Sequence, residues 1–119
     1  MRLSYTISGD RRRPAVLFLH GFMGSSGDWG GITAVLEERY FCVAVDLPGH
    51  GTSVGLPLES YTFEVAARMV LAVLGELGIE RTTLVGYSMG GRLALYTALR
   101  IPQRVSRLVL VGASPGIAD

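Results

Sequence analysis

The stretch Gly86-Tyr87-Ser88-Met89-Gly90 places one serine between two glycines. The residues before Ser88 favour a strand and those after it favour a helix, so the serine falls at a strand-to-helix junction. A sharp turn there would lift the hydroxyl clear of the backbone, near the positive end of the helix, and the glycines would let strand and helix approach closely. The pattern favours a catalytic nucleophile; the alternative is a serine that only caps the helix.

A second glycine-rich stretch, His20-Gly21-Phe22-Met23-Gly24, follows an apolar run. A glycine at this place would let the chain turn so that a backbone N–H faces the serine. The N–H groups of Phe22 and Met89 would then form a two-donor oxyanion hole. His20 and His50 are both expected to brace loops, and neither is a good candidate for the base that would activate Ser88.

Sequence periodicity predicts the elements that would position these residues. Predicted strands are an edge strand at 3–7 and further, mostly apolar strands at 15–19, 41–45, 82–86 and 105–111. The first predicted helix has Asp28 as its cap and extends to Tyr40. The second begins at Ser60 or Thr62 and ends at Gly78, and the third runs from Met89 to Ile101. This alternation predicts an α/β domain over residues 1–119, with a mainly parallel sheet and flanking helices.

Composition narrows the class of protein. Hydrophobic residues make up 49% of the chain and the formal net charge is +1, values typical of a globular core. The cluster Arg11-Arg12-Arg13 is too short for a nucleic-acid or membrane surface and is expected to be a solvated turn. No apolar stretch approaches the roughly 20 residues needed to cross a bilayer. We therefore expect a soluble, cytoplasmic protein with no nucleic-acid or membrane partner.

Four stretches carry a family resemblance: "LFLHGFMGSSGDW", "VDLPGHGTS", "LVGYSMGGRLAL" and "LVLVGASPG". In order and spacing they resemble signatures of the α/β-hydrolase superfamily, whose nucleophile elbow is the turn at Ser88. The arginine after "GYSMGG" and the "ASPG" stretch make the chain most similar to the 2-succinyl-6-hydroxy-2,4-cyclohexadiene-1-carboxylate synthases of menaquinone and phylloquinone biosynthesis. Generic esterases share the first two stretches.

The resemblance implies an elimination. A base removes a proton from 2-succinyl-5-enolpyruvyl-6-hydroxy-3-cyclohexene-1-carboxylate, and pyruvate leaves as the ring becomes a diene. It implies no cofactor and no metal. It makes Ser88 the triad serine, Phe22 and Met89 the oxyanion donors, and Arg92 a residue that binds a carboxylate of the dicarboxylate substrate. Arg92 could equally be a surface arginine paired with a nearby acid.

The other triad members are not found after Ser88. The superfamily order is serine, acid, histidine, yet the residues that follow Ser88 include no histidine, and their one acid is Asp119. We interpret the chain as the N-terminal part of a hydrolase domain, without later strands or cap, and expect it to be inactive alone. The alternatives are a carboxylesterase or carbon–carbon hydrolase of the same superfamily, and an inactive half-domain that binds a partner chain. The oligomeric state stays open.

Overall fold

A mainly parallel sheet forms the centre of the computed structural model, which describes residues 3–21, 24–47 and 62–112. The sheet order is β1-β3-β2-β4-β5, and only β1 is antiparallel to its neighbour. The strands are β1 (Tyr5–Ser8), β2 (Ala15–Leu19), β3 (Phe41–Val45), β4 (Thr82–Tyr87) and β5 (Val105–Val111). The helices are α1 (Gly30–Leu36), α2 (Phe63–Glu76) and α3 (Met89–Arg100), with 3-10 turns η1 (Ser26–Trp29) and η4 (Pro102–Arg104). The predicted α/β architecture is confirmed, with β1 at the sheet edge.

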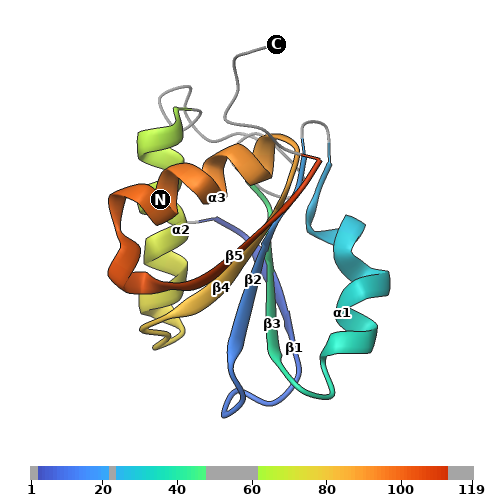
Figure 1. Ribbon diagram of the computed structural model, residues 1–119. Helices are drawn as coiled ribbons and strands as arrows, with labels where there is room; N and C mark the ends of the chain where they lie inside the picture. Colours follow the sequence, from blue (N-terminus) through green and yellow to red (C-terminus); the bar gives the residue numbers. More distant parts are fainter. Residues whose placement is uncertain (1–2, 22–23, 48–61, 113–119) are drawn as a thin grey trace.

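The helices cover the two faces of the sheet unequally. Figure 1 shows α1 on one face and α2 and α3 on the other. Alternate residues of β2 divide between the faces: Leu17 and Leu19 pack in the large core with α2 and α3, whereas Val16 and Phe18 pack with Trp29 in a smaller cluster. Burial on both faces explains why β2 and β3 are apolar throughout.

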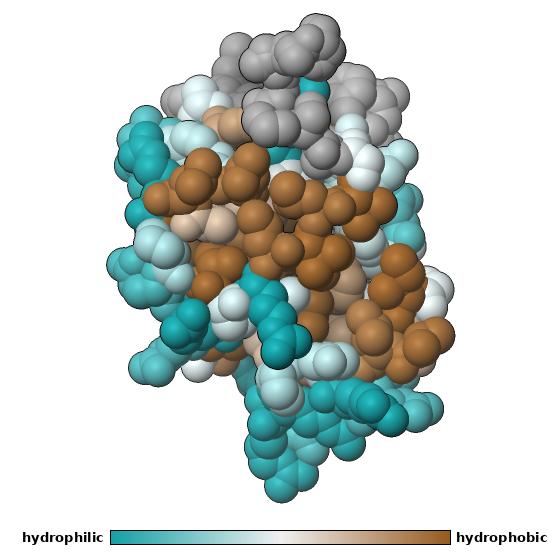
Figure 2. All heavy atoms as spheres, viewed as in Figure 1, coloured by the Kyte–Doolittle hydropathy of each residue, from teal (hydrophilic) through white to brown (hydrophobic). Residues whose placement is uncertain are grey.

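An apolar surface remains over β5 and α1. Figure 2 shows hydrophobic side chains gathered across this side of the molecule. Val109 and Val111 of β5 are 44% and 45% exposed, and Val35 of α1 is 72% exposed. In the described part of the chain no strand pairs with the outer edge of β5. Exposed apolar strand edges favour association with other chains.

The start of α1 differs from the prediction. Asp28 does not cap a helix but lies within η1, where its carboxylate accepts a hydrogen bond of 3.2 Å from the N–H of Ser25. This local contact stabilises a 3-10 turn first, and α1 follows only at Gly30. The helix also ends at Leu36, so Tyr40 lies beyond it.

The ends of α2 and α3 lie close to the predicted ones. Thr62 caps α2, its side chain accepting a 3.1 Å hydrogen bond from the N–H of Val65. Gly78 follows the helix at φ 71°, the left-handed conformation that glycine adopts without strain. α3 ends at Arg100, shortly before Pro102. Within residues 3–21, 24–47 and 62–112, no helix combines the length and apolar character needed to span a membrane.

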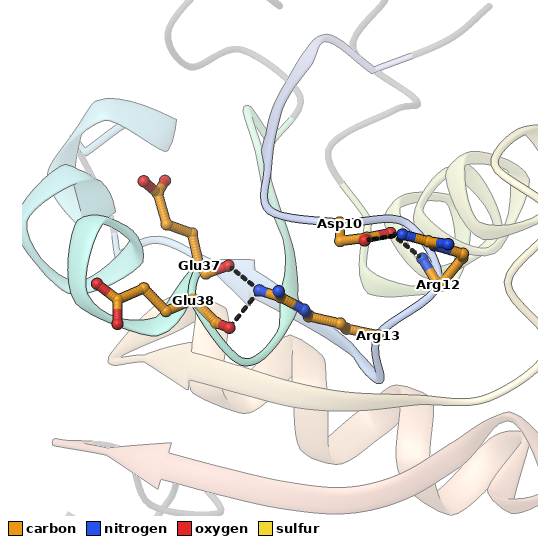
Figure 3. A network of polar contacts seen from close by, with 5 residues as sticks. All are labelled: Asp10, Arg12, Arg13, Glu37 and Glu38. Carbon is orange, nitrogen blue, oxygen red and sulfur yellow. Dashed lines mark hydrogen bonds and ion pairs between the residues drawn. The ribbon is translucent and has the colours of Figure 1, made fainter.

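The three consecutive arginines lie on an exposed turn and contact other parts of the chain. Figure 3 shows Arg12 paired with Asp10, at 2.7 Å, and Arg13 directed at the backbone carbonyls of Glu37 and Glu38, just after α1. Arg11 lies with its guanidinium 5.6 Å from the ring centre of Phe41. The contacts of Arg13 satisfy carbonyls that follow the end of α1 and link the turn before β2 to the connection after α1.

Candidate functional site

Ser88 stands alone between the last residue of β4 and the first residue of α3. Its backbone has φ 53° and ψ −113°, and among the described residues it is the one non-glycine with positive φ. That conformation is strained for an L-amino acid. The N–H of Ser88 donates a 3.0 Å hydrogen bond to the carbonyl of Val111, and its own carbonyl accepts one from the N–H of Arg92. Hydrogen bonds to β5 and to the first turn of α3 therefore fix the backbone of Ser88.

The side chain of Ser88 does not cap α3. Ser88 occupies the N-cap position, but its hydroxyl makes no capping hydrogen bond. A capping serine has an extended backbone and accepts a bond from the N–H two or three residues later, and Ser88 meets neither condition. The capping alternative does not explain the conformation, and Ser88 is partly exposed.

Two glycines allow the turn to be this tight. A Cβ at Gly86 would collide with the backbone carbonyl of Gly90. A Cβ at Gly90 would collide with the carbonyl oxygens of Leu19 and His20, at the end of β2. Both obstacles are main-chain atoms, which cannot rotate away as a flexible side chain would. Glycine is thus required at both positions, because the backbones of β4, the start of α3 and the end of β2 lie too close together for a side chain.

His20 is buried at the end of β2, with 1% of its surface exposed. Its Nε2 accepts a 3.0 Å hydrogen bond from the N–H of Leu47, so the ring proton lies on Nδ1, which is 2.8 Å from the carbonyl oxygen of Gly21. The ring thereby links the segments that follow β2 and β3. These contacts use both nitrogens in backbone hydrogen bonds.

The other predicted site residues divide into three groups. Met89 is the first residue of α3, so its N–H is one of the donors that the helix itself leaves unpaired. Arg92 is exposed on the first turn of α3, and the described residues give its guanidinium no hydrogen bond or ion pair. Phe22 and His50 lie outside the described residues. The structure therefore brings Ser88, Met89 and His20 to one end of the sheet.

Sequence reasoning missed Asp46, which follows β3. Its side chain is buried, with 4% exposed, and Oδ1 accepts a 2.7 Å hydrogen bond from the N–H of Ser26. The available signal was a carboxylate directly after a fully apolar strand, which is costly to bury without a partner. Among residues 3–21, 24–47 and 62–112, no group of three or more His, Cys, Asp or Glu side chains is placed to hold a metal ion.

Known proteins resemble the chain along most of its length. It is 39% identical over 112 residues to 2-succinyl-6-hydroxy-2,4-cyclohexadiene-1-carboxylate synthase of Serratia proteamaculans, covering 93% of this chain and 43% of that protein. It is 38% identical to the mouse sn-1-specific diacylglycerol lipase ABHD11, covering 95% of this chain and 37% of the lipase. A crystal structure of a hydrolase from Pseudomonas aeruginosa superposes with a TM-score of 0.91 at 28% identity, covering 98% of this chain and 43% of that one.

The chain spans less than half the length of each of these three relatives. The sequence model of the family described as alpha/beta hydrolase fold matches residues 14–119. That match includes β2 to β5, α1 to α3 and the turn at Ser88. The chain therefore belongs to the alpha/beta hydrolase fold family.

Proposed function

We propose that this chain supplies the nucleophile and oxyanion-binding part of an enzyme active site. The observation that carries the proposal is the backbone of Ser88, φ 53° and ψ −113°, in a turn where the hydroxyl is not used for capping. A strained residue persists only where its surroundings determine it, and such residues concentrate at functional sites. The turn is what a nucleophile elbow requires: a serine lifted off the backbone between a strand and a helix.

The developing negative charge would be stabilised by backbone donors. The N–H of Met89 points out of the first turn of α3, where the helix dipole adds positive potential. The N–H of Phe22 is the proposed second donor. A base is still needed, and its place in the family order is after Ser88. Expressed by itself, the 119-residue polypeptide is expected to show no turnover.

For the whole enzyme we propose the synthase reaction of menaquinone or phylloquinone biosynthesis, in which a base removes a substrate proton and pyruvate leaves. Support comes from the relative named as that synthase, at 39% identity over 93% of this chain. Arg92 supports a dicarboxylate substrate, because its guanidinium is exposed on the helix turn that follows Ser88. A planar guanidinium binds a carboxylate through two parallel hydrogen bonds.

The rival within the family is an ester or carbon–carbon hydrolase that uses Ser88 for acyl transfer. The relative named as a diacylglycerol lipase, at 38% identity, favours that alternative. A separate alternative, an inactive module that binds a partner chain, is favoured by the exposed apolar residues of β5. That alternative gives no reason for the strain at Ser88, so we place it last.

Arg92→Ala separates the two enzymatic proposals. In the natural protein that carries this sequence, the variant is expected to lower kcat/KM for the succinyl cyclohexene dicarboxylate by about 100-fold, the typical loss of a charged hydrogen-bond pair. Turnover of a neutral p-nitrophenyl ester should change by less than about threefold. Arg107→Ala, which removes an exposed arginine from β5, is the matched control. Equal losses on both substrates would refute the dicarboxylate assignment.

A further inference from the structure

Two buried polar residues directly follow the neighbouring strands β2 and β3. Leu19 of β2 pairs with Val45 of β3 in a parallel register, so the next residues, His20 and Asp46, lie at the same end of the sheet, after the carboxyl ends of both strands. They are 1% and 4% exposed. Burial of an imidazole and a carboxylate is unfavourable unless hydrogen bonds offset the loss of water. The hydrogen-bond partners of His20 and Asp46 therefore show which backbone segments the two side chains fix.

Each of the two side chains bonds to the backbone of a different connection. Asp46 Oδ1 accepts the N–H of Ser26 at 2.7 Å, across 20 residues of sequence. His20 Nε2 accepts the N–H of Leu47 at 3.0 Å, across 27 residues. The backbone of Asp46 is itself fixed, since its N–H donates a 2.8 Å bond to the carbonyl of Ser4. The segment after β2 is thus attached to the end of β3 at both His20 and Ser26.

Gly21, at the start of this segment, lies directly against the Ser88 turn. Gly21 is so close to Tyr87 that a Cβ on Gly21 would lie 2.8 Å from the ring atom Cδ2. On the other side, Gly90 contacts the carbonyls of Leu19 and His20. Phe22, the proposed oxyanion donor, falls in the sequence between the two attached positions, His20 and Ser26. A displacement of the attached positions would therefore disturb the contact between Gly21 and Tyr87, next to Ser88.

We propose that Asp46 is a positioning residue for the reaction at Ser88: its carboxylate fixes the segment after β2 through the N–H of Ser26. This rests on the proposed function, because a positioning role needs a reaction to position. Asp46 acts through the backbone and not on substrate, as its Oδ1 is engaged at 2.7 Å and its side chain is buried. An ionised carboxylate that accepts an amide N–H makes a stronger hydrogen bond than a neutral acceptor does.

Two variants in the natural protein test the role. Asp46→Asn keeps an oxygen acceptor for Ser26 but removes the charge, whereas Asp46→Ala removes the acceptor. We expect kcat to fall by about 100-fold in Asp46→Ala, the typical cost of a displacement near 1 Å, and by less than about tenfold in Asp46→Asn. KM should stay within about twofold in both. Asp28→Ala is the control, because Asp28 also accepts a backbone N–H of this segment, that of Ser25, but is exposed.

Amide hydrogen exchange supplies a readout that does not depend on turnover. Protection of the Ser26 amide should fall in Asp46→Ala and persist in Asp46→Asn, while amides of β4 keep theirs. Loss of Ser26 protection with kcat unchanged would overturn the proposal, as would equal losses of kcat in the Asp46 and Asp28 variants. Should Asp46→Ala fail to fold, the Asp46→Asn variant decides: wild-type kcat with a less protected Ser26 amide would overturn the proposal. A wild-type rate in Ser88→Ala would instead refute the proposed function.

Discussion

The two ends of the sheet use polar side chains in different ways. Before the parallel strands, exposed arginines bond to carbonyls near helix ends, as Arg13 does at Glu37 and Glu38 after α1. After the strands, the buried side chains of His20 and Asp46 hold backbone N–H groups, and Ser88 is strained. The first end is built for stability, because cations there complement the helix termini. The second places strain and buried polarity where α/β sheets bind ligands.

The largest effect is expected from Gly90→Ala. The added Cβ would meet the carbonyls of Leu19 and His20, so the free energy of unfolding should fall by about 3 kcal/mol, and activity should be lost. Gly75→Ala is the matched control: no atom lies within 4 Å of its added Cβ. There the free energy of unfolding should stay level or rise by up to about 1 kcal/mol, because alanine favours the helix. Urea unfolding measures both, and equal effects would contradict the close approach at Gly90.

Substitution of Ser88 should separate stability from activity. Ser88→Gly relieves the strain at φ 53°, whereas Ser88→Ala keeps it. We expect the glycine variant to be more stable than the alanine variant by about 1 kcal/mol, although both lose activity. Urea unfolding of the two variants gives the difference. An alanine variant as stable as the glycine variant would show that the turn is not strained.

A smaller effect on stability alone is expected at the opposite end of the sheet. Arg13→Ala removes hydrogen bonds to the carbonyls of Glu37 and Glu38, and should lower the free energy of unfolding by about 0.5–1 kcal/mol. Catalytic rates should be unchanged, since the residue is at the end far from Ser88. Arg107→Ala, at an arginine without a described partner, should be neutral. A loss of rate in Arg13→Ala would break the contrast between the two ends.

The smallest effect concerns Asp10. Two hydrogen bonds lower the pKa of Asp10 from 3.8 to about 2. The larger contribution comes from the Arg12 side chain and the smaller one from the Arg12 backbone N–H. A lowered pKa means that the pair stabilises the fold above about pH 4 and that this contribution disappears as the pH falls through about 2. The gain is small because the pair is exposed. NMR titration of Asp10 should show the low pKa, and Arg12→Ala should raise it only part of the way toward 3.8, because the backbone N–H of residue 12 still bonds to the carboxylate.

Sequence patterns predicted the framework because its signals are local. Apolar runs marked β2 and β3, the glycine at 78 marked the end of α2, and Thr62 was one of two caps considered. The strand-to-helix position of Ser88 followed from the change of residue types around it. Burial on both faces and helix termination each leave a mark within a few residues.

The parts that were missed or wrong depend on contacts between distant residues or on local competition. Asp46 could not be assigned a role because its partner Ser26 lies 20 residues earlier. The helix predicted from Asp28 was wrong because the carboxylate bonds to Ser25 and favours a 3-10 turn. The functions of Phe22, Met89 and Arg92 stay predictions, since they depend on a substrate and on the rest of an active site.

The most direct test of the central claim, that this turn presents a nucleophilic serine, is covalent labelling of the natural protein with a fluorophosphonate probe. Peptide mass spectrometry should find one adduct, on Ser88, and Ser88→Ala should abolish it. Ser106→Ala, which removes an exposed serine of β5, should leave labelling unchanged. A protein that turns over substrate yet carries no adduct on Ser88, or one labelled equally after Ser88→Ala, would contradict the account.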